Sequence, residues 1–118
     1  GIRKKQGDEL HVSWRLAFAP GTLRAVSRKN GKDVVVREIK TAGKPARIIL
    51  EADRSVLNHS GSDLSFVTVK VVDEQGVLVP DADNLITFSV TGNGVVAGVD
   101  NGDPVTHASF KALERKVF

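Results

Sequence analysis

The stretch DLSFVTVKVVDEQGVLVPDADN, residues 63–84, decides the fold. Its first arm alternates Val67, Val69 and Val71 with polar residues, which is the period of a β-strand that buries one face. The acidic turn at residues 73–76 reverses the chain, and a proline ends the second arm. We therefore predict a central β-hairpin whose three valines fill a core.

The residues before this stretch also have strand patterns. Residues 10–18 place their large apolar side chains on one parity, which predicts a half-buried strand. Trp14 lies on that apolar parity, so a core tryptophan is favoured over a sugar-stacking platform. Asn30-Gly31 joins the runs 22–28 and 32–39, and it is a strong hairpin signal because a type I′ turn needs positive φ at both central residues. Together these segments predict three antiparallel strands.

Residues 41–45 contain a glycine, a proline and no apolar pattern, so we place a linker and a domain boundary there. Further strands are predicted at residues 46–52, 85–90 and 95–99, each followed by turn residues. Residues 110–118 are ambiguous: their Leu-Glu-Arg-Lys run would suit a helix, and a strand and an irregular tail are both open as well. Short strands separated by frequent turn signals predict an all-β, antiparallel sandwich.

The composition is that of a folded globular protein. The 118 residues leave room for one modest domain, or for one domain plus part of another. No apolar run approaches the roughly 18–20 residues that span a bilayer, so we expect no membrane segment. The net charge of +3 is small and scattered and aromatic residues make up only 5%, so we expect no nucleic-acid binding. Without cysteine the chain has no disulfide, and the compartment is left open.

No metal site is indicated. His11, His59 and His107 lie far apart in the sequence, and a zinc or iron site needs converging ligands. The acidic turns at residues 81–84 and 100–103 could offer oxygen ligands to calcium, but neither has the spacing of an EF-hand. Turn formation explains their Asp and Asn residues better, because these side chains bond their own backbone. We expect no metal and no cofactor.

No catalytic residue is predicted either. Glycoside hydrolysis uses two carboxyl groups about 5–10 Å apart, one of which has a raised pKa. The 14 Asp and Glu residues lie in turns, beside turns or on solvent-facing strand positions, and none is bracketed by apolar residues. The serines lack the strand-to-helix context of a nucleophile elbow.

Six pieces of the chain, taken in order, carry a family resemblance. They are FAPGTLRAV (18–26), TAGKP (41–45), DRS (53–55), DLSFVTV (63–69), VPDADN (79–84) and GVDNGDP (98–104). In this order they resemble the C-terminal region of bacterial glycoside hydrolase family 2 enzymes, chiefly the β-galactosidases. The resemblance covers nearly the whole chain.

The resemblance implies an immunoglobulin-like β-sandwich. Residues 1–42 would be the last strands of a preceding immunoglobulin-like domain, and residues 43–118 a bacterial immunoglobulin-like domain that lacks its final strand. In this family the catalytic pair of glutamates lies in an upstream (β/α)₈ barrel. The chain would then be a non-catalytic accessory part of a parent enzyme that hydrolyses glycosidic bonds, and that enzyme would be periplasmic or secreted.

The expected partners are the barrel and the other domains of that parent enzyme. A sandwich with an open edge also pairs with other chains, so we expect a homo-oligomer formed by strand pairing or by exchange of the N-terminal arm. The alternative function is a glycan- or surface-binding module. Its candidate contact residues are the aromatic side chains Phe66, Phe110 and Phe118.

Overall fold

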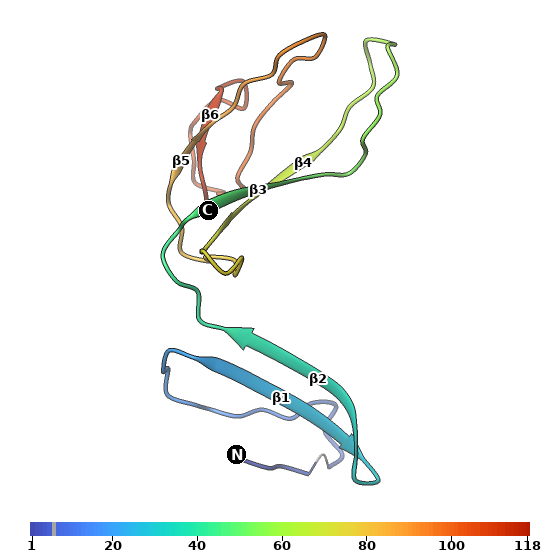
Figure 1. Ribbon diagram of the computed structural model, residues 1–118, viewed down its shortest axis with the longest axis vertical. Helices are drawn as coiled ribbons and strands as arrows, with labels where there is room; N and C mark the ends of the chain where they lie inside the picture. The colour runs from blue at the N-terminus through green and yellow to red at the C-terminus, as the bar shows by residue number, and fades with distance from the viewer. Residues whose placement is uncertain (6) are drawn as a thin grey trace. The chain divides into compact units, whose positions relative to one another are not determined.

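The computed structural model describes residues 1–5 and 7–118, which form two compact units, Gly1–Lys40 and Thr41–Phe118. No described residue lies in a helix, so no described helix is long and apolar enough to cross a membrane. Each of the three ladders is antiparallel, which confirms the predicted all-β class. The strands of the described residues are β1 Thr22–Lys29, β2 Lys32–Lys40, β3 Arg47–Ala52, β4 Val67–Val72, β5 Leu85–Thr87 and β6 Glu114–Lys116 (Figure 1).

The first unit is built on the β1–β2 hairpin. Its turn has φ angles of 52° at Asn30 and 74° at Gly31, the positive values that the Asn-Gly pair predicts. The register runs from Thr22 opposite Lys40 to Lys29 opposite Lys32, with a bulge between Ser27 and Arg28. The predicted hairpin is therefore confirmed.

The strand predicted at residues 10–18 is absent from the described structure, and this prediction is wrong. Trp14 is 44% exposed, so the predicted core tryptophan is wrong as well. Leu10 and Phe18, on the same apolar parity, are also exposed. An alternating pattern becomes a strand only where a sheet edge accepts it and a surface covers its apolar face. In the described residues β1 pairs with β2 alone, and no surface covers the apolar side chains at positions 10, 14 and 18, so the second condition is not met.

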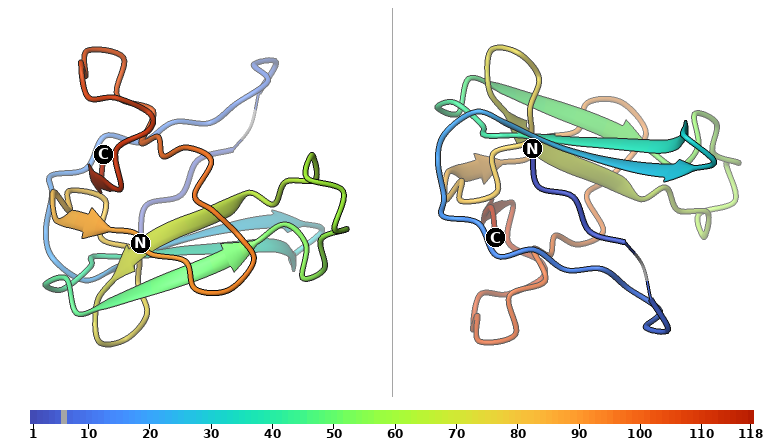
Figure 2. Two further views of the ribbon diagram at one scale, coloured as in Figure 1. Left: turned by 90° about the horizontal axis from the view of Figure 1, so that it is seen from above. Right: turned by 90° about the horizontal axis from the view of Figure 1, so that it is seen from below.

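The second unit contains two separate ladders, β3–β4 and β5–β6, which Figure 2 shows from two further directions. In the β3–β4 ladder, residues that stand directly opposite each other share a face. One face is apolar and carries the pairs Ile48↔Val71, Leu50↔Val69 and Ala52↔Val67. The other face is mixed: it carries Ile49 and the buried Val72, and on it Lys70 forms an ion pair with Glu51 at 2.6 Å.

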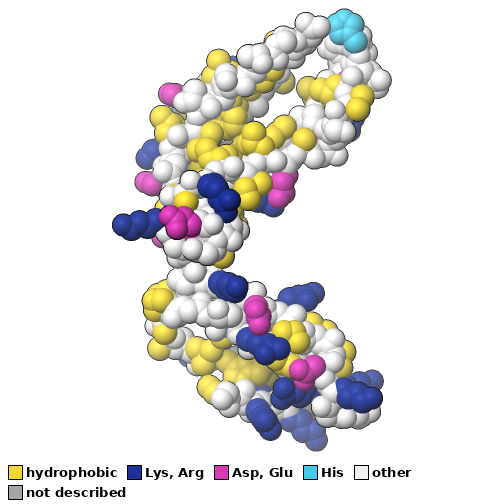
Figure 3. All heavy atoms as spheres, viewed as in Figure 1, with side chains coloured by type: hydrophobic (Ala, Val, Ile, Leu, Met, Phe, Trp, Pro, Cys, Tyr) yellow, Lys and Arg dark blue, Asp and Glu magenta, His cyan; other side chains and the backbone are white. Residues whose placement is uncertain are grey.

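The core of this unit covers only one end of β4. Val71, Val79 and Ala82 are buried together, with Ala42, Ile86 and Val117 packed around them. Val71 is 4% exposed, whereas Val67 on the same strand face is 52% exposed. The prediction that three valines fill the core is thus right for Val71 and wrong for Val67, because no described segment covers the far end. Figure 3 shows an opening in this unit with hydrophobic side chains along its rim.

The remaining predicted strands are shorter than expected or absent. Residues 85–90 form a strand only over Leu85–Thr87, and the return arm of the central stretch makes an isolated bridge, Val72 to Leu78. Residues 95–99 form no strand, so that prediction is wrong. Within residues 110–118, the residues Glu114–Lys116 form strand β6, and the rest of the segment is irregular.

Arg115 of β6 gives the reason for the missing strand at residues 95–99. Its buried guanidinium donates to the carbonyl oxygens of Val99 at 2.8 Å, Ser109 at 2.9 Å and Ala108 at 3.4 Å. In this segment the Val99 carbonyl is thus bonded to a side chain, while its N–H donates to the Phe110 carbonyl at 2.8 Å without a continuous ladder forming. Arg115 therefore holds the long connection between β5 and β6 onto the unit.

Candidate functional site

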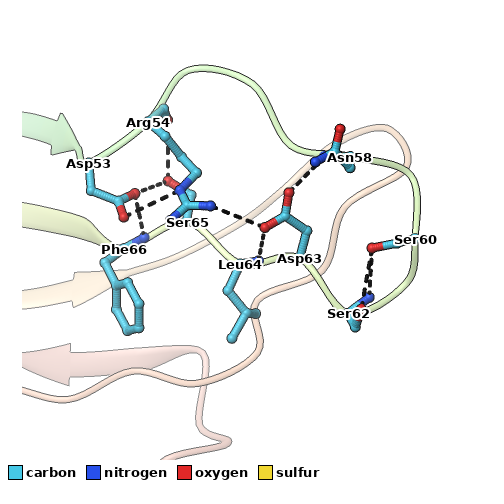
Figure 4. Close-up of polar contacts among 9 residues, drawn as sticks. All are labelled: Asp53, Arg54, Asn58, Ser60, Ser62, Asp63, Leu64, Ser65 and Phe66. Atoms are coloured by element: carbon cyan, nitrogen blue, oxygen red, sulfur yellow. Dashed lines mark hydrogen bonds and ion pairs between the residues drawn. The ribbon is translucent and has the colours of Figure 1, made fainter.

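The connection between β3 and β4, residues 53–66, carries a network of polar side chains, and we call it the β3–β4 loop (Figure 4). Asp53 and Phe66 close its base: the Asp53 N–H donates to the Phe66 carbonyl at 3.0 Å. The Phe66 N–H donates to Asp53 Oδ1, also at 3.0 Å, and the Ser65 hydroxyl donates to the same oxygen at 2.8 Å. These bonds extend the β3–β4 pairing beyond the ladder.

Asp63 organises the far part of the loop. Its carboxylate accepts from the Asn58 N–H at 2.8 Å, from the Leu64 N–H at 3.1 Å and from Arg54 at 3.2 Å. The Arg54 Nε also lies 3.5 Å from Asp53 Oδ2, so one guanidinium bridges both carboxylates. A loop of this length is thus held in shape by polar contacts, with little apolar burial.

Both carboxyl groups of the loop titrate below their ordinary range. The hydroxyl of Ser65 is the main cause that lowers the pKa of Asp53. The backbone N–H of Asn58 is the main cause that lowers the pKa of Asp63. A general acid in glycoside hydrolysis needs a raised pKa instead. The loop therefore presents a pre-shaped surface with ionised carboxylates and lacks an acid–base pair.

Asp73 forms a second polar centre, at the opposite end of β4. It is 3% exposed and accepts three backbone N–H groups: Gly43 at 2.8 Å on Oδ2, and Gln75 at 2.9 Å and Val77 at 2.8 Å on Oδ1. The bond from Gly43 is the main cause that lowers the pKa of this carboxyl, against the opposite effect of burial. Asp73 thus fastens the segment before β3 to the turn after β4.

A hollow of about 500 Å³ lies beside this anchored segment. The buried side chains of Val79 and Ala82 and the exposed residues Asp81 and Asp83 line it, together with residues 42–45 and 84. Within the described residues, no three His, Cys, Asp or Glu side chains converge as a metal site would require.

The three predicted glycan-contact residues are exposed and separate. Phe66 is 71%, Phe110 61% and Phe118 74% exposed. Figure 4 shows the Phe66 ring and the Leu64 side chain projecting away from the polar contacts of the loop. The guanidinium of Arg115 lies 5.9 Å from the centroid of the Phe110 ring. No ring contact joins the three phenylalanines in the described part of the chain, so they do not form one aromatic platform.

Sequence reasoning missed the roles of Arg54 and Ser65. The acids of the loop were expected near turns, and they do lie in a connection between strands. The spacing Asp53-Arg54 with Asp63 ten residues later could have suggested an ion-pair bridge, because an arginine between two acids in one loop can reach both. No local pattern identifies Ser65 as the donor to Asp53, since that bond depends on the β3–β4 register.

The comparisons with protein families divide the chain in two. The family described as glycoside hydrolase family 2 C-terminal domain 5 matches residues 48–118. A domain of unknown function, DUF4982, matches residues 1–35. A beta-galactosidase of Bacteroides ovatus, BoGH2A, is 56% identical over 118 residues, which is all of this chain and 14% of that enzyme. The chain thus spans about one seventh of this relative.

Solved structures agree with this match. A glycosyl hydrolase family 2 member from Bacteroides cellulosilyticus is 37% identical with a TM-score of 0.85, over 89% of this chain and 14% of the other. A beta-glycosidase from Bacteroides vulgatus is 25% identical with a TM-score of 0.80, over the same shares of the two chains. The strands therefore have the immunoglobulin-like arrangement that the resemblance implied. The chain belongs to glycoside hydrolase family 2 and carries its C-terminal domain 5.

Proposed function

We propose that this chain is a non-catalytic accessory region of a β-galactosidase-type glycoside hydrolase. The observation that carries the proposal is the 56% identity along the whole chain to BoGH2A, of which the matched part is only 14%. In the proposed parent enzyme, glycosidic bonds are hydrolysed by two glutamates of a (β/α)₈ barrel outside this chain. The accessory region packs against the barrel and the other domains and shapes the mouth of the cleft.

The carboxyl groups of the chain support this proposal. Asp53, Asp63 and Asp73 each accept several hydrogen bonds, and each has a lowered pKa. A carboxyl in this state is a poor proton donor to a leaving group. None of the three offers the raised pKa that hydrolysis requires of its acid.

The test is an activity assay on the purified chain. We expect no turnover of nitrophenyl β-galactoside at high protein concentration. Turnover that co-purifies with the chain and is abolished by Asp63→Asn or Asp53→Asn would overturn the proposal. If these variants leave the turnover unchanged, variants of the remaining Asp and Glu residues are assayed in the same way. Turnover that persists in every variant would come from a contaminating enzyme.

We further propose the domain division that the resemblance implies. Residues 1–42 belong to one immunoglobulin-like domain, and residues 43–118 belong to the next one. The two compact units, Gly1–Lys40 and Thr41–Phe118, and the separate family matches of residues 1–35 and 48–118 support this division.

The open strand edges lead to a proposal about assembly. A two-stranded ladder leaves backbone groups unpaired on both outer edges, and such edges recruit further strands. The chain therefore forms a homo-oligomer through these edges when it is isolated. Light scattering at high protein concentration tests this, and a strictly monomeric mass would count against it.

A glycan- or surface-binding module is the second candidate, favoured by the exposure of Phe66, Phe110 and Phe118. Exposed aromatic rings are the surfaces on which sugar rings stack. Calorimetry against galactosides and neutral plant polysaccharides distinguishes the two candidates. Absence of heat, with Phe66→Ala as a matched variant, would remove this second function.

A further inference from the structure

Positive charge is concentrated in the first unit. Residues 1–40 contain ten Lys and Arg against four Asp and Glu, a net charge of +6, whereas residues 41–118 have a net charge of −3. Figure 3 shows the Lys and Arg side chains gathered over the unit that contains β1 and β2. The prediction that the excess charge is scattered is therefore wrong: the overall charge of +3 conceals a division between residues 1–40 and residues 41–118.

The tip of the β1–β2 hairpin holds two lysines in a repulsive arrangement. Lys29 and Lys32 stand directly opposite each other on either side of the Asn30-Gly31 turn. Like charges at such a position destabilise a hairpin. Both lysines are exposed, and neither side-chain ammonium group has a hydrogen-bond or ion-pair partner among the described residues. An anion bound between them would relieve the repulsion.

A third cation extends this face along the hairpin. Ala25 and Lys29 lie on the same face of β1, because side chains of a strand alternate, and Ala25 stands opposite Arg37. Among the described residues the Arg37 guanidinium donates only to the Val36 carbonyl, at 3.1 Å. On the opposite face, by contrast, Arg24 and Arg28 are neutralised by ion pairs.

This spacing fits an extended ligand. Four residues of strand place the Ala25–Arg37 pair roughly 13 Å from the Lys29–Lys32 pair. One small anion therefore cannot reach all three cations. No aromatic residue lies in residues 22–40, so the hairpin has no platform on which bases or neutral sugars could stack. The same face also carries the exposed apolar side chains of Leu23, Val35 and Ile39. Its three cations are the groups that suit a linear polymer with repeated negative charge.

We propose that this face, Lys29, Lys32 and Arg37, binds an acidic polysaccharide whose sugars carry carboxylate or sulfate groups. The choice of a polysaccharide rests on the proposed function, because a glycosidase parent brings the hairpin to glycan chains. Polymer binding through cations weakens steeply with salt, since bound counterions are released on association.

The experiment is affinity electrophoresis of the full chain in gels containing polygalacturonate, dextran sulfate or neutral galactan, at several salt concentrations. The variant is K29Q/K32Q, and the matched control is K44Q/K116Q, which removes the same charge from the second unit. Circular dichroism verifies that both variants fold. We expect K29Q/K32Q to lose roughly tenfold in affinity for the acidic polymers and to show a shallower salt dependence, while the control stays near wild type.

Equal losses in the two variants would overturn the proposal, because net charge alone would then govern retention. Retention in neutral galactan as strong as retention in the acidic polymers would also overturn the proposal. Salt-sensitive self-association that K29Q/K32Q abolishes, without polymer binding, would identify a second copy of the chain as the partner instead. Retention by only one acidic polymer would support the proposal and tell carboxylate from sulfate. The nitrophenyl assay is read separately, so failure here leaves the accessory role intact.

Discussion

The two ends of β4 have the same strand pattern and different surroundings. At one end Val71 is buried against Val79 and Ala82, and the adjoining Asp73 is enclosed by backbone N–H groups. At the other end Val67 is half exposed, and the carboxylates of the β3–β4 loop bind their partners at the surface. An alternating pattern determines which way a side chain points. Its burial depends on what the rest of the chain places above it.

Replacement of Asp73 with alanine should produce the largest loss of stability. The N–H groups of Gly43, Gln75 and Val77 would lose a buried acceptor at once, and buried unsatisfied groups are strongly destabilising. We expect the unfolding midpoint to fall by roughly 10 °C. Thermal unfolding followed by circular dichroism measures it.

Asp63→Ala is the matched control for this prediction. Asp63 also accepts two backbone N–H groups, but on an exposed loop where water can replace the lost acceptor. Its midpoint should change by only about 3 °C or less. Equal losses in the two variants would mean that burial does not distinguish the two ends of β4.

The second prediction compares two valines on one face of β4. Val71→Ala removes two methyl groups from a packed site and should cost about 2 kcal/mol. Val67→Ala removes them from a half-exposed site and should cost less than about 0.5 kcal/mol. Urea unfolding measures both free energies. A large loss at Val67 would indicate that another segment or another copy covers the open end in solution.

The sequence was informative where structure depends on neighbours along the chain. The Asn30-Gly31 hairpin, β3 and β4 follow from turn chemistry and alternation, and so does the turn that begins at Asp73. The bond between Asp73 and Gly43 could not be predicted, because it joins residues 30 positions apart and depends on where the segment before β3 lies. The strand predicted at residues 10–18 is absent for the same physical reason. An alternating pattern does not determine whether another strand pairs with the segment or whether a surface covers its apolar face.

The third prediction concerns pH. Asp53, Asp63 and Asp73 have pKa values below their ordinary value of 3.8. A depressed pKa in the folded state means that the stabilisation is complete above about pH 4 and is lost as the pH falls through the folded value. Acid unfolding should therefore begin below about pH 4. Asp73→Asn should flatten the decline, because the titrating carboxyl is gone, and a decline as steep as that of wild type would exclude Asp73 as a contributor.

A small global effect is expected at Arg54, which bridges Asp53 and Asp63 at the open end. This guanidinium is half exposed, and exposed ion pairs contribute little, so Arg54→Gln should cost less than about 1 kcal/mol. The effect of Arg54→Gln on the β3–β4 loop should be larger than its effect on global stability, because Asp63 would hold the Asn58 N–H less firmly without Arg54. Amide exchange at Asn58 should therefore accelerate, while exchange at Gly43, bonded to Asp73, stays unchanged. Acceleration at both amides would mean that the two ends of β4 open together as one cooperative unit.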